Sequence, residues 1–333
     1  MSYKIYRKGS YFYIIDTATN REYSGLFNET TVQRHAISSS TFYFNNIENW
    51  KNNKAVEIAD IDDYNGDAYT TASFVAFYES SSGAGSLGTD PFTQIALGNV
   101  TGQRIFNAMG ERESMGTTST GEDIWRGAAT TIPTPSAAGE QMTFVSSNDA
   151  DNGATATGVL TVKMHYLDAT GAEQEETITM NGTTEVDTVA TDIRFVNDIY
   201  SLTVGSNGVA EGNIIVYKKG AAATIYNLIA LGGNKSLVPS RMIPLGKTLI
   251  LKEWHAEEAQ ARRVNFRIRS TDMYGVLIPG VFCFKDAIYL KQDSSSFHLN
   301  AKIPALSIIK VSGWASQAGA EGSCGWWGIL VDS

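Results

Sequence analysis

The chain has 333 residues, enough for two or three domains that each bury a core of their own. Its 35 Asp and Glu residues outnumber its 26 Lys and Arg residues, which gives a net charge of −9 at pH 7. An acidic chain gains nothing from counterion release on a polyphosphate, so we expect no direct binding of nucleic acid. No apolar run approaches 18 residues, Lys and Arg never form a run longer than two, and the first ten residues lack the apolar core of a signal peptide. We therefore expect a protein that is made in the cytoplasm and has no membrane contact.

The first part of the chain mixes strand and helix signals. Strands are predicted over residues 11–15, 21–23 and 41–44. After a polar loop, Thr70 can cap a helix in which Phe74, Phe77 and Tyr78 share one face. These signals predict a small α+β module over residues 1–85.

The next stretch has no regular period. A Ser/Gly-rich connector covers residues 80–88, and glycine recurs often from residue 90 to residue 127. We therefore predict a Gly-rich extended arm or linker over residues 86–121. Residues 90–127 carry too much apolar surface to stay in solvent. We expect this surface to pack against a neighbouring subunit, and the alternative is that it packs against the chain's own sandwich. The side chains proposed to form this inter-subunit arm are Ile95, Leu97, Val100, Ile105, Phe106, Met109 and Trp125.

The rest of the chain reads as short strands separated by turns. Residues 158–182 contain two β-rich runs on either side of Asp168-Ala169-Thr170-Gly171, which predicts a β-hairpin. Further on, Val264, Phe266 and Ile268 alternate with polar residues and should face a core. We predict β-sandwiches over residues 122–220 and 221–333, the second a sandwich or jelly roll. The expected fold class is mainly β: two antiparallel β-sandwich or jelly-roll domains preceded by the small α+β module.

No set of residues predicts catalysis, a metal or a cofactor. The four histidines show no metal-ligand spacing, and no phosphate-binding or nucleophile motif stands at a strand-to-helix turn. The acidic loops 60–67 and 148–153 do not fit an EF-hand frame, so we expect solvated turns there. Cys283 and Cys324 lie in aromatic strands and are expected to be reduced and buried. We therefore predict a protein that is not an enzyme, with no catalytic, metal or cofactor-binding residues.

Several blocks resemble virion structural proteins of tailed bacteriophages. They are GNVTGQ (98–103), EDIWRG (122–127), FVSSNDADNGATATGV (144–159) and YLDATGAEQEETITMNGTTEV (166–186). The amino-terminal stretches at 11–25, 41–50 and 58–70 also look like a phage structural module. The resemblance covers the first two thirds of the chain. It implies a virion component attached to capsid, neck or tail, with other copies of itself, expected as a trimer, and other virion proteins as partners.

An adhesive role is the alternative. Sandwich domains with exposed aromatic side chains often bind glycans, and Trp254, Trp314, Trp326 and Trp327 are available. The alternative function is therefore a phage adhesin or glycan-binding fibre or receptor-binding protein with a host surface glycan as partner. For Trp326 and Trp327, core packing is the favoured interpretation, because the last strand should bury at least one of the two rings.

Overall fold

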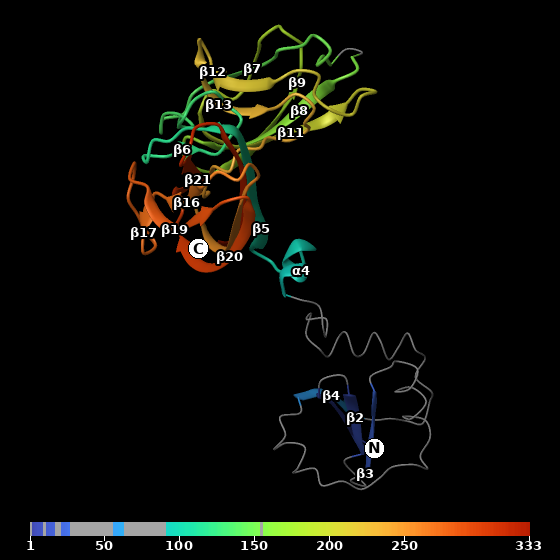
Figure 1. The fold of residues 1–333 in the computed structure, drawn as a ribbon. Helices are drawn as coiled ribbons and strands as arrows, with labels where there is room; N and C mark the ends of the chain where they lie inside the picture. Colours follow the sequence, from blue (N-terminus) through green and yellow to red (C-terminus); the bar gives the residue numbers. More distant parts are fainter. Residues whose placement is uncertain (1, 9–10, 17–20, 27–55, 63–90, 154–155) are drawn as a thin grey trace. The chain divides into compact units, whose positions relative to one another are not determined.

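The fold was analysed in a computed structural model that describes residues 2–8, 11–16, 21–26, 56–62, 91–153 and 156–333 (Figure 1). The chain divides into two compact units, Met1–Thr93 and Gln94–Ser333. The first contains an antiparallel sheet in the order β3-β2-β1-β4. Its strands are β1 (Ser2–Lys8), β2 (Tyr11–Asp16), β3 (Arg21–Leu26) and β4 (Val56–Asp62). The strands expected at 11–15 and 21–23 are confirmed, and those expected at 41–44 and the helix at 70–78 lie outside the described residues.

The short helix α4 (Pro91–Ala96) spans the boundary between the two units, and the second unit contains two β-sandwiches. The first sandwich pairs a sheet in the order β10-β7-β12-β13 with a sheet in the order β11-β8-β9. Its strands are β7 (Met142–Ser146), β8 (Val159–Asp168), β9 (Glu173–Thr179), β10 (Val186–Asp187), β11 (Ile193–Val204), β12 (Ile214–Lys218) and β13 (Ala221–Ile229). The predicted hairpin is confirmed, because β8 pairs with β9 from Thr161–Thr179 to Leu167–Glu173.

The second sandwich is orange to red in Figure 1, with β5 in teal along it. One sheet has the order β14-β21-β16-β19 with β6 beside β21, and the other has the order β20-β15-β22-β5. The first of these sheets contains β6 (Glu122–Asp123), β14 (Arg241–Met242), β16 (Val264–Ser270), β19 (Cys283–Leu290) and β21 (Ile308–Ala315). The second contains β5 (Gln103–Met115), β15 (Lys247–Glu258), β20 (Asp293–Ile303) and β22 (Ala320–Asp332). A two-residue turn joins β17 (Asp272–Met273) to β18 (Val276–Leu277).

Each sandwich has a separate apolar core between its two sheets. Val264, Phe266 and Ile268 are fully buried in the second core, as their alternation predicts. Every strand pairing among the described residues is antiparallel, so the mainly β fold with two antiparallel sandwiches is as expected. No helix among the described residues is long and apolar enough to cross a membrane.

The expected arm and domain boundaries need correction. Residues 103–115 form β5, which pairs with β22 and completes the second sandwich. The boundary placed between residues 220 and 221 separates β12 from β13, two strands that pair with each other, so the first sandwich extends to Ile229. The inward positions of β5 include Ala108, Gly110 and Arg112, which do not give an apolar period. Gly110 is required there, because a Cβ atom would overlap the Ile124 carbonyl and the Pro239 ring.

The loop at 148–153 also differs in part from its expected solvated state. Asp149 is exposed, but Asp151 is completely buried. The Asp151 carboxylate accepts hydrogen bonds from Ser146 Oγ at 2.6 Å and from the backbone nitrogens of Val159, Glu211 and Gly212 at 2.8 to 3.0 Å. These donors come from different segments, so this buried carboxylate fixes the loops at one end of the first sandwich.

Candidate functional site

The residues proposed to form an inter-subunit arm do not make one surface. Phe106 is buried in the core of the second sandwich, and Trp125 packs with Ile132, Leu228 and Val238. Ile95 is buried on α4, whereas Val100 and Ile105 are half-buried. Leu97 and Met109 are 66% and 58% exposed. The apolar side chains that called for a neighbouring subunit are thus largely covered by the chain itself, and the alternative host, its own sandwich, is where Phe106 lies.

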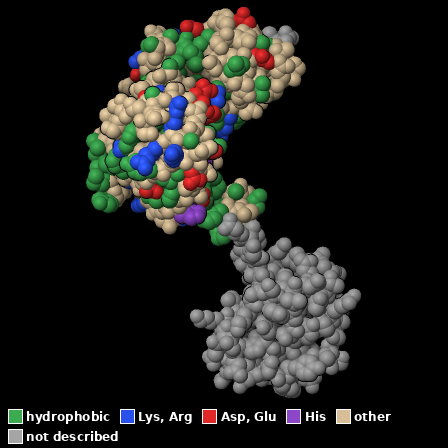
Figure 2. All heavy atoms as spheres, in the orientation of Figure 1, with side chains coloured by type: hydrophobic (Ala, Val, Ile, Leu, Met, Phe, Trp, Pro, Cys, Tyr) green, Lys and Arg blue, Asp and Glu red, His purple; other side chains and the backbone are tan. Residues whose placement is uncertain are grey.

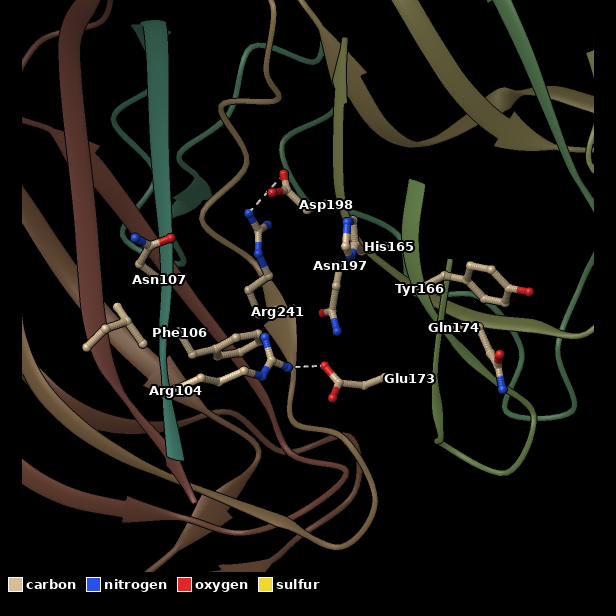
Figure 3. Close-up of a pocket in the computed structure, with 11 residues that line it drawn as sticks. Arg104, Phe106, Asn107, His165, Tyr166, Glu173, Gln174, Asn197, Asp198 and Arg241 are labelled. Carbon is tan, nitrogen blue, oxygen red and sulfur yellow. Dashed lines mark hydrogen bonds and ion pairs between the residues drawn. The ribbon is translucent and has the colours of Figure 1, made fainter. Parts of the chain in front are cut away.

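A cleft of about 190 Å³ lies between the two sandwiches (Figure 3). On one side, Arg104 of β5 pairs with Glu173 of β9. Deeper in the cleft, Arg241 of β14 lies 3.3 Å from a carboxylate oxygen of Asp198 on β11. The cleft therefore brings together cations and carboxylates from both sandwiches.

Both arginines of this cleft form ion pairs with carboxylates of the first sandwich. Arg241 is buried and donates to the carbonyl oxygens of Val238 and Ser240 at 2.8 and 2.9 Å. Burial lowers the pKa of Arg241, and the nearby carboxylate of Asp198 opposes that shift. An apolar cluster formed by Leu167, Phe195, Met242 and Ile308 connects β8 and β11 of the first sandwich with β14 and β21 of the second. This arrangement is a joint that holds the two sandwiches together.

The described residues do not gather a metal-binding set. No group of three or more His, Cys, Asp or Glu side chains within them is close enough to hold an ion. Cys324 is buried, and burial raises its pKa. Cys283 is only half-buried, which corrects the expectation that both thiols are shielded. Cys283 lines a surface cavity together with Met273, Tyr274 and Phe284.

Large hydrophobic side chains are exposed together around the β17–β18 turn and along β19. Figure 2 shows hydrophobic atoms gathered at this left edge of the second sandwich. We call the group the turn surface. It comprises Met273, Tyr274, Val276, Val281, Phe284 and Tyr289, which are 47% to 97% exposed. Exposed apolar side chains that are grouped in this way are typical of surfaces that contact another molecule.

The turn itself has an unusual residue at its tip. Tyr274 and Gly275 have φ angles of +51° and +80°, and they are the two connecting residues of the β17–β18 hairpin. Two successive residues with positive φ are typical of a type I′ turn, for which Asn-Gly is the preferred pair. Tyr274 is instead a large aromatic residue that is 97% exposed. Tyr274 lies outside the apolar alternation that predicts the neighbouring strands, so the sequence pattern alone does not reveal its exposure.

A cavity of about 730 Å³ opens within the turn surface. Met273, Tyr274, Cys283 and Phe284 line it, and Lys302 of β20 lies at its wall. Its size and apolar lining suit the insertion of side chains from another molecule. The turn surface therefore combines a projecting side chain, Tyr274, with a cavity that can accept side chains.

The tryptophans considered for glycan binding have different environments. Trp254 on β15 and Trp326 on β22 are buried, and the burial of Trp326 confirms that the last strand places one of its two rings in the core. Trp314 stacks on Arg267, and Trp327 Nε1 donates to Glu253 at 3.4 Å. Of the four, two are therefore core residues.

No family model and no curated protein matches the sequence. Among solved structures, the chain is similar to one from the structure of infectious bursal disease virus, Gx strain. The alignment covers 73% of this chain and 78% of that chain, with 11% sequence identity and a TM-score of 0.21. A TM-score this low does not establish a shared fold.

Proposed function

We propose that the chain is a non-enzymatic structural component of a bacteriophage particle, a building block that binds other copies of itself through the turn surface. The resemblance of residues 98–103, 122–127, 144–159 and 166–186 to phage virion proteins supports the virion role. Two separate buried cores, connected by polar and apolar contacts between the sandwiches, support a structural role. A trimer that also contacts other virion proteins is the proposed assembly.

Tyr274 is the observation that carries this proposal. A residue with a Cβ atom at this φ costs about 1 kcal/mol relative to glycine, and asparagine tolerates the conformation better than tyrosine. The exposed ring buries almost nothing within the described fold, so it does not offset that cost there. A partner that covers the ring would offset it, because tyrosine is among the residues that contribute most to protein interfaces.

The test separates the stability of the subunit from its association. In Tyr274→Asn, the turn receives its preferred residue, so the melting temperature of the isolated subunit should stay unchanged or rise. The association constant, measured by sedimentation velocity across a concentration series, should fall by at least about tenfold. Val189→Asn is a matched control, because Val189 is 89% exposed on the other sandwich.

Two outcomes would contradict the proposal. A wild-type chain that stays monomeric throughout the micromolar range would show that the chain does not self-associate. Association of Tyr274→Asn at the wild-type level would show that copies meet elsewhere. The control variant should associate as the wild type does.

A further inference from the structure

Arg267 on β16 is held between two aromatic rings of the same sheet face. Its guanidinium carbon lies 3.7 Å from the centroid of the Trp314 ring and 4.7 Å from that of Phe284. Phe284 belongs to the turn surface and is 60% exposed. The rings fix the orientation of the guanidinium group, which reduces the entropy that it loses when it binds a ligand.

Within the described residues, the Arg267 guanidinium has no carboxylate partner and no hydrogen bond from its own chain, only these two ring contacts. Its neighbours differ. Arg269 and Lys310 share the buried carboxylate of Asp123, with N to O distances of 3.3 and 2.7 Å. This part of the sheet therefore has three cations and one carboxylate on one face.

The excess positive charge on this face affects the pKa of Arg269. Burial is the main cause that lowers the pKa of Arg269, Asp123 opposes the shift, and the charge of Arg267 adds to it. Lys302, at the wall of the adjacent cavity, has no ion pair within the described part of the chain. An acidic protein thus carries a local cationic and aromatic region beside the turn surface.

A guanidinium group among aromatic side chains favours a carboxylate as its ligand. A planar guanidinium group binds a carboxylate with two parallel hydrogen bonds, and these bonds strengthen where aromatic side chains exclude water. Arginine among exposed tyrosine and phenylalanine is typical of the energetic centre of a protein interface. A second copy of this chain offers suitable carboxylates, because its 35 acidic residues exceed its 26 basic ones.

We infer that Arg267 receives a carboxylate from a second copy of the chain and that the copies therefore meet head to tail. This inference rests on the proposed function. In a two-fold dimer whose turn surfaces face each other, their cations would repel each other. Contact between the turn surface of one copy and carboxylates elsewhere on the next copy avoids this repulsion. A repeated head-to-tail contact closes into a ring, such as a trimer, when the rotation between copies is a whole fraction of a full turn.

The carboxylate can be captured in the full chain. Arg267→Lys keeps the positive charge and provides an amine, which a zero-length carbodiimide joins to any carboxylate in contact with it. Equal amounts of ¹⁵N-labelled and unlabelled chains would be mixed, cross-linked, digested and analysed by mass spectrometry. We expect a peptide containing position 267 to be joined to an Asp or Glu peptide of the other isotope. Arg263→Lys, at an exposed position just before β16, is the control and should give no such product.

Association gives a second readout. Arg267→Met keeps an apolar side chain between the rings and removes the donors, so we expect association to weaken by at least about tenfold. Raising the salt concentration should weaken wild-type association more than that of Arg267→Met. A wild-type oligomer with neither the cross-link nor any loss in Arg267→Met would overturn the inference, as would a two-fold dimer. A monomeric wild type would instead overturn the proposed function.

Discussion

Asn197 and Met242 join the two sandwiches through a reciprocal pair of hydrogen bonds. The Met242 backbone nitrogen donates to Asn197 Oδ1 at 2.8 Å, and Asn197 Nδ2 donates to the Met242 carbonyl oxygen at 3.1 Å. Asn197 is on β11 and Met242 on β14. The side-chain amide of Asn197 therefore bonds to a strand of the other sandwich in the way that the backbone amide of a neighbouring strand does. Both residues are buried, which makes each of these bonds costly to lose.

Replacement of Asn197 should loosen this joint. Asn197→Ala leaves a buried donor and a buried acceptor without partners, and we expect a loss of about 1 to 3 kcal/mol in the free energy of unfolding. Asn197→Asp keeps an acceptor for Met242 N but sets an oxygen against the Met242 carbonyl, so it should not restore stability. Urea unfolding followed by circular dichroism measures both variants. An unchanged midpoint for Asn197→Ala would mean that the joint does not depend on this pair.

Asp151 should be essential to the first sandwich. In Asp151→Asn, one carboxylate oxygen that accepts hydrogen bonds is replaced by a donor that faces other donors. We expect a loss of about 2 to 3 kcal/mol, because hydrogen bonds to a charged group exceed those between neutral groups. Asp149→Asn, two residues away at an exposed site, should change the urea midpoint much less. Equal effects of the two substitutions would contradict the role given to burial.

Alkaline pH should destabilise the fold partly through Tyr217. Burial, and then a hydrogen bond with Glu185, raises the pKa of Tyr217 to about 12. In the unfolded chain a tyrosine ionises near its ordinary pKa of about 10. The folded chain therefore holds the proton more tightly, so this stabilisation is complete below about pH 10 and is lost as the pH rises towards about 12.

The measurement is the melting temperature from pH 8 to pH 12. Its fall above about pH 10 should be shallower in Tyr217→Phe than in the wild type. Tyr289→Phe, at a residue that is 64% exposed, serves as the control. If Tyr217→Phe followed the wild-type curve, ionisation of Tyr217 would play no part in alkaline unfolding.

The two thiols should react at different rates. Cys283 lines the cavity in the turn surface, and Cys324 is buried with a raised pKa. Without denaturant, a thiol reagent should label Cys283 first and leave Cys324 unmodified, because the thiolate is the reactive form. Labelling of Cys283 should also slow as the chain concentration rises, since association would cover the cavity. A rate independent of concentration in a chain that associates would place Cys283 outside the contact.

Local patterns predicted much of the fold. The β8–β9 hairpin and the inward face of β16 follow from β-rich runs, a turn and strict alternation, which act over a few residues. Strand β5 was missed because its inward face carries Gly110 and Arg112. These two fit only because of the Pro239 ring and Glu122, which come from elsewhere in the chain. Single-sequence periodicity does not contain such long-range contacts.

The candidate surface was harder to predict than the fold. The alternation of Val264, Phe266 and Ile268 places Arg267 on the opposite face of β16, but its position between Trp314 and Phe284 depends on the lateral order of β21, β16 and β19. The exposure of Tyr274 depends on a two-residue turn, which lies before the apolar run that begins at Val276 and has no Asn-Gly or Asp-Gly signal. Functional surfaces of this kind arise from strand order and turn type, which the sequence pattern specifies only weakly.

The central claim is that the chain is a building block of a phage particle, and the protein content of those particles tests it most directly. Particles of the phage whose genome encodes the chain would be purified on a density gradient, washed at high salt and analysed by quantitative mass spectrometry. We predict that the chain remains with the particles in a fixed ratio to the other virion proteins, and in a multiple of three if the trimer is correct. A chain that is abundant in the lysate and absent from washed particles would contradict the account.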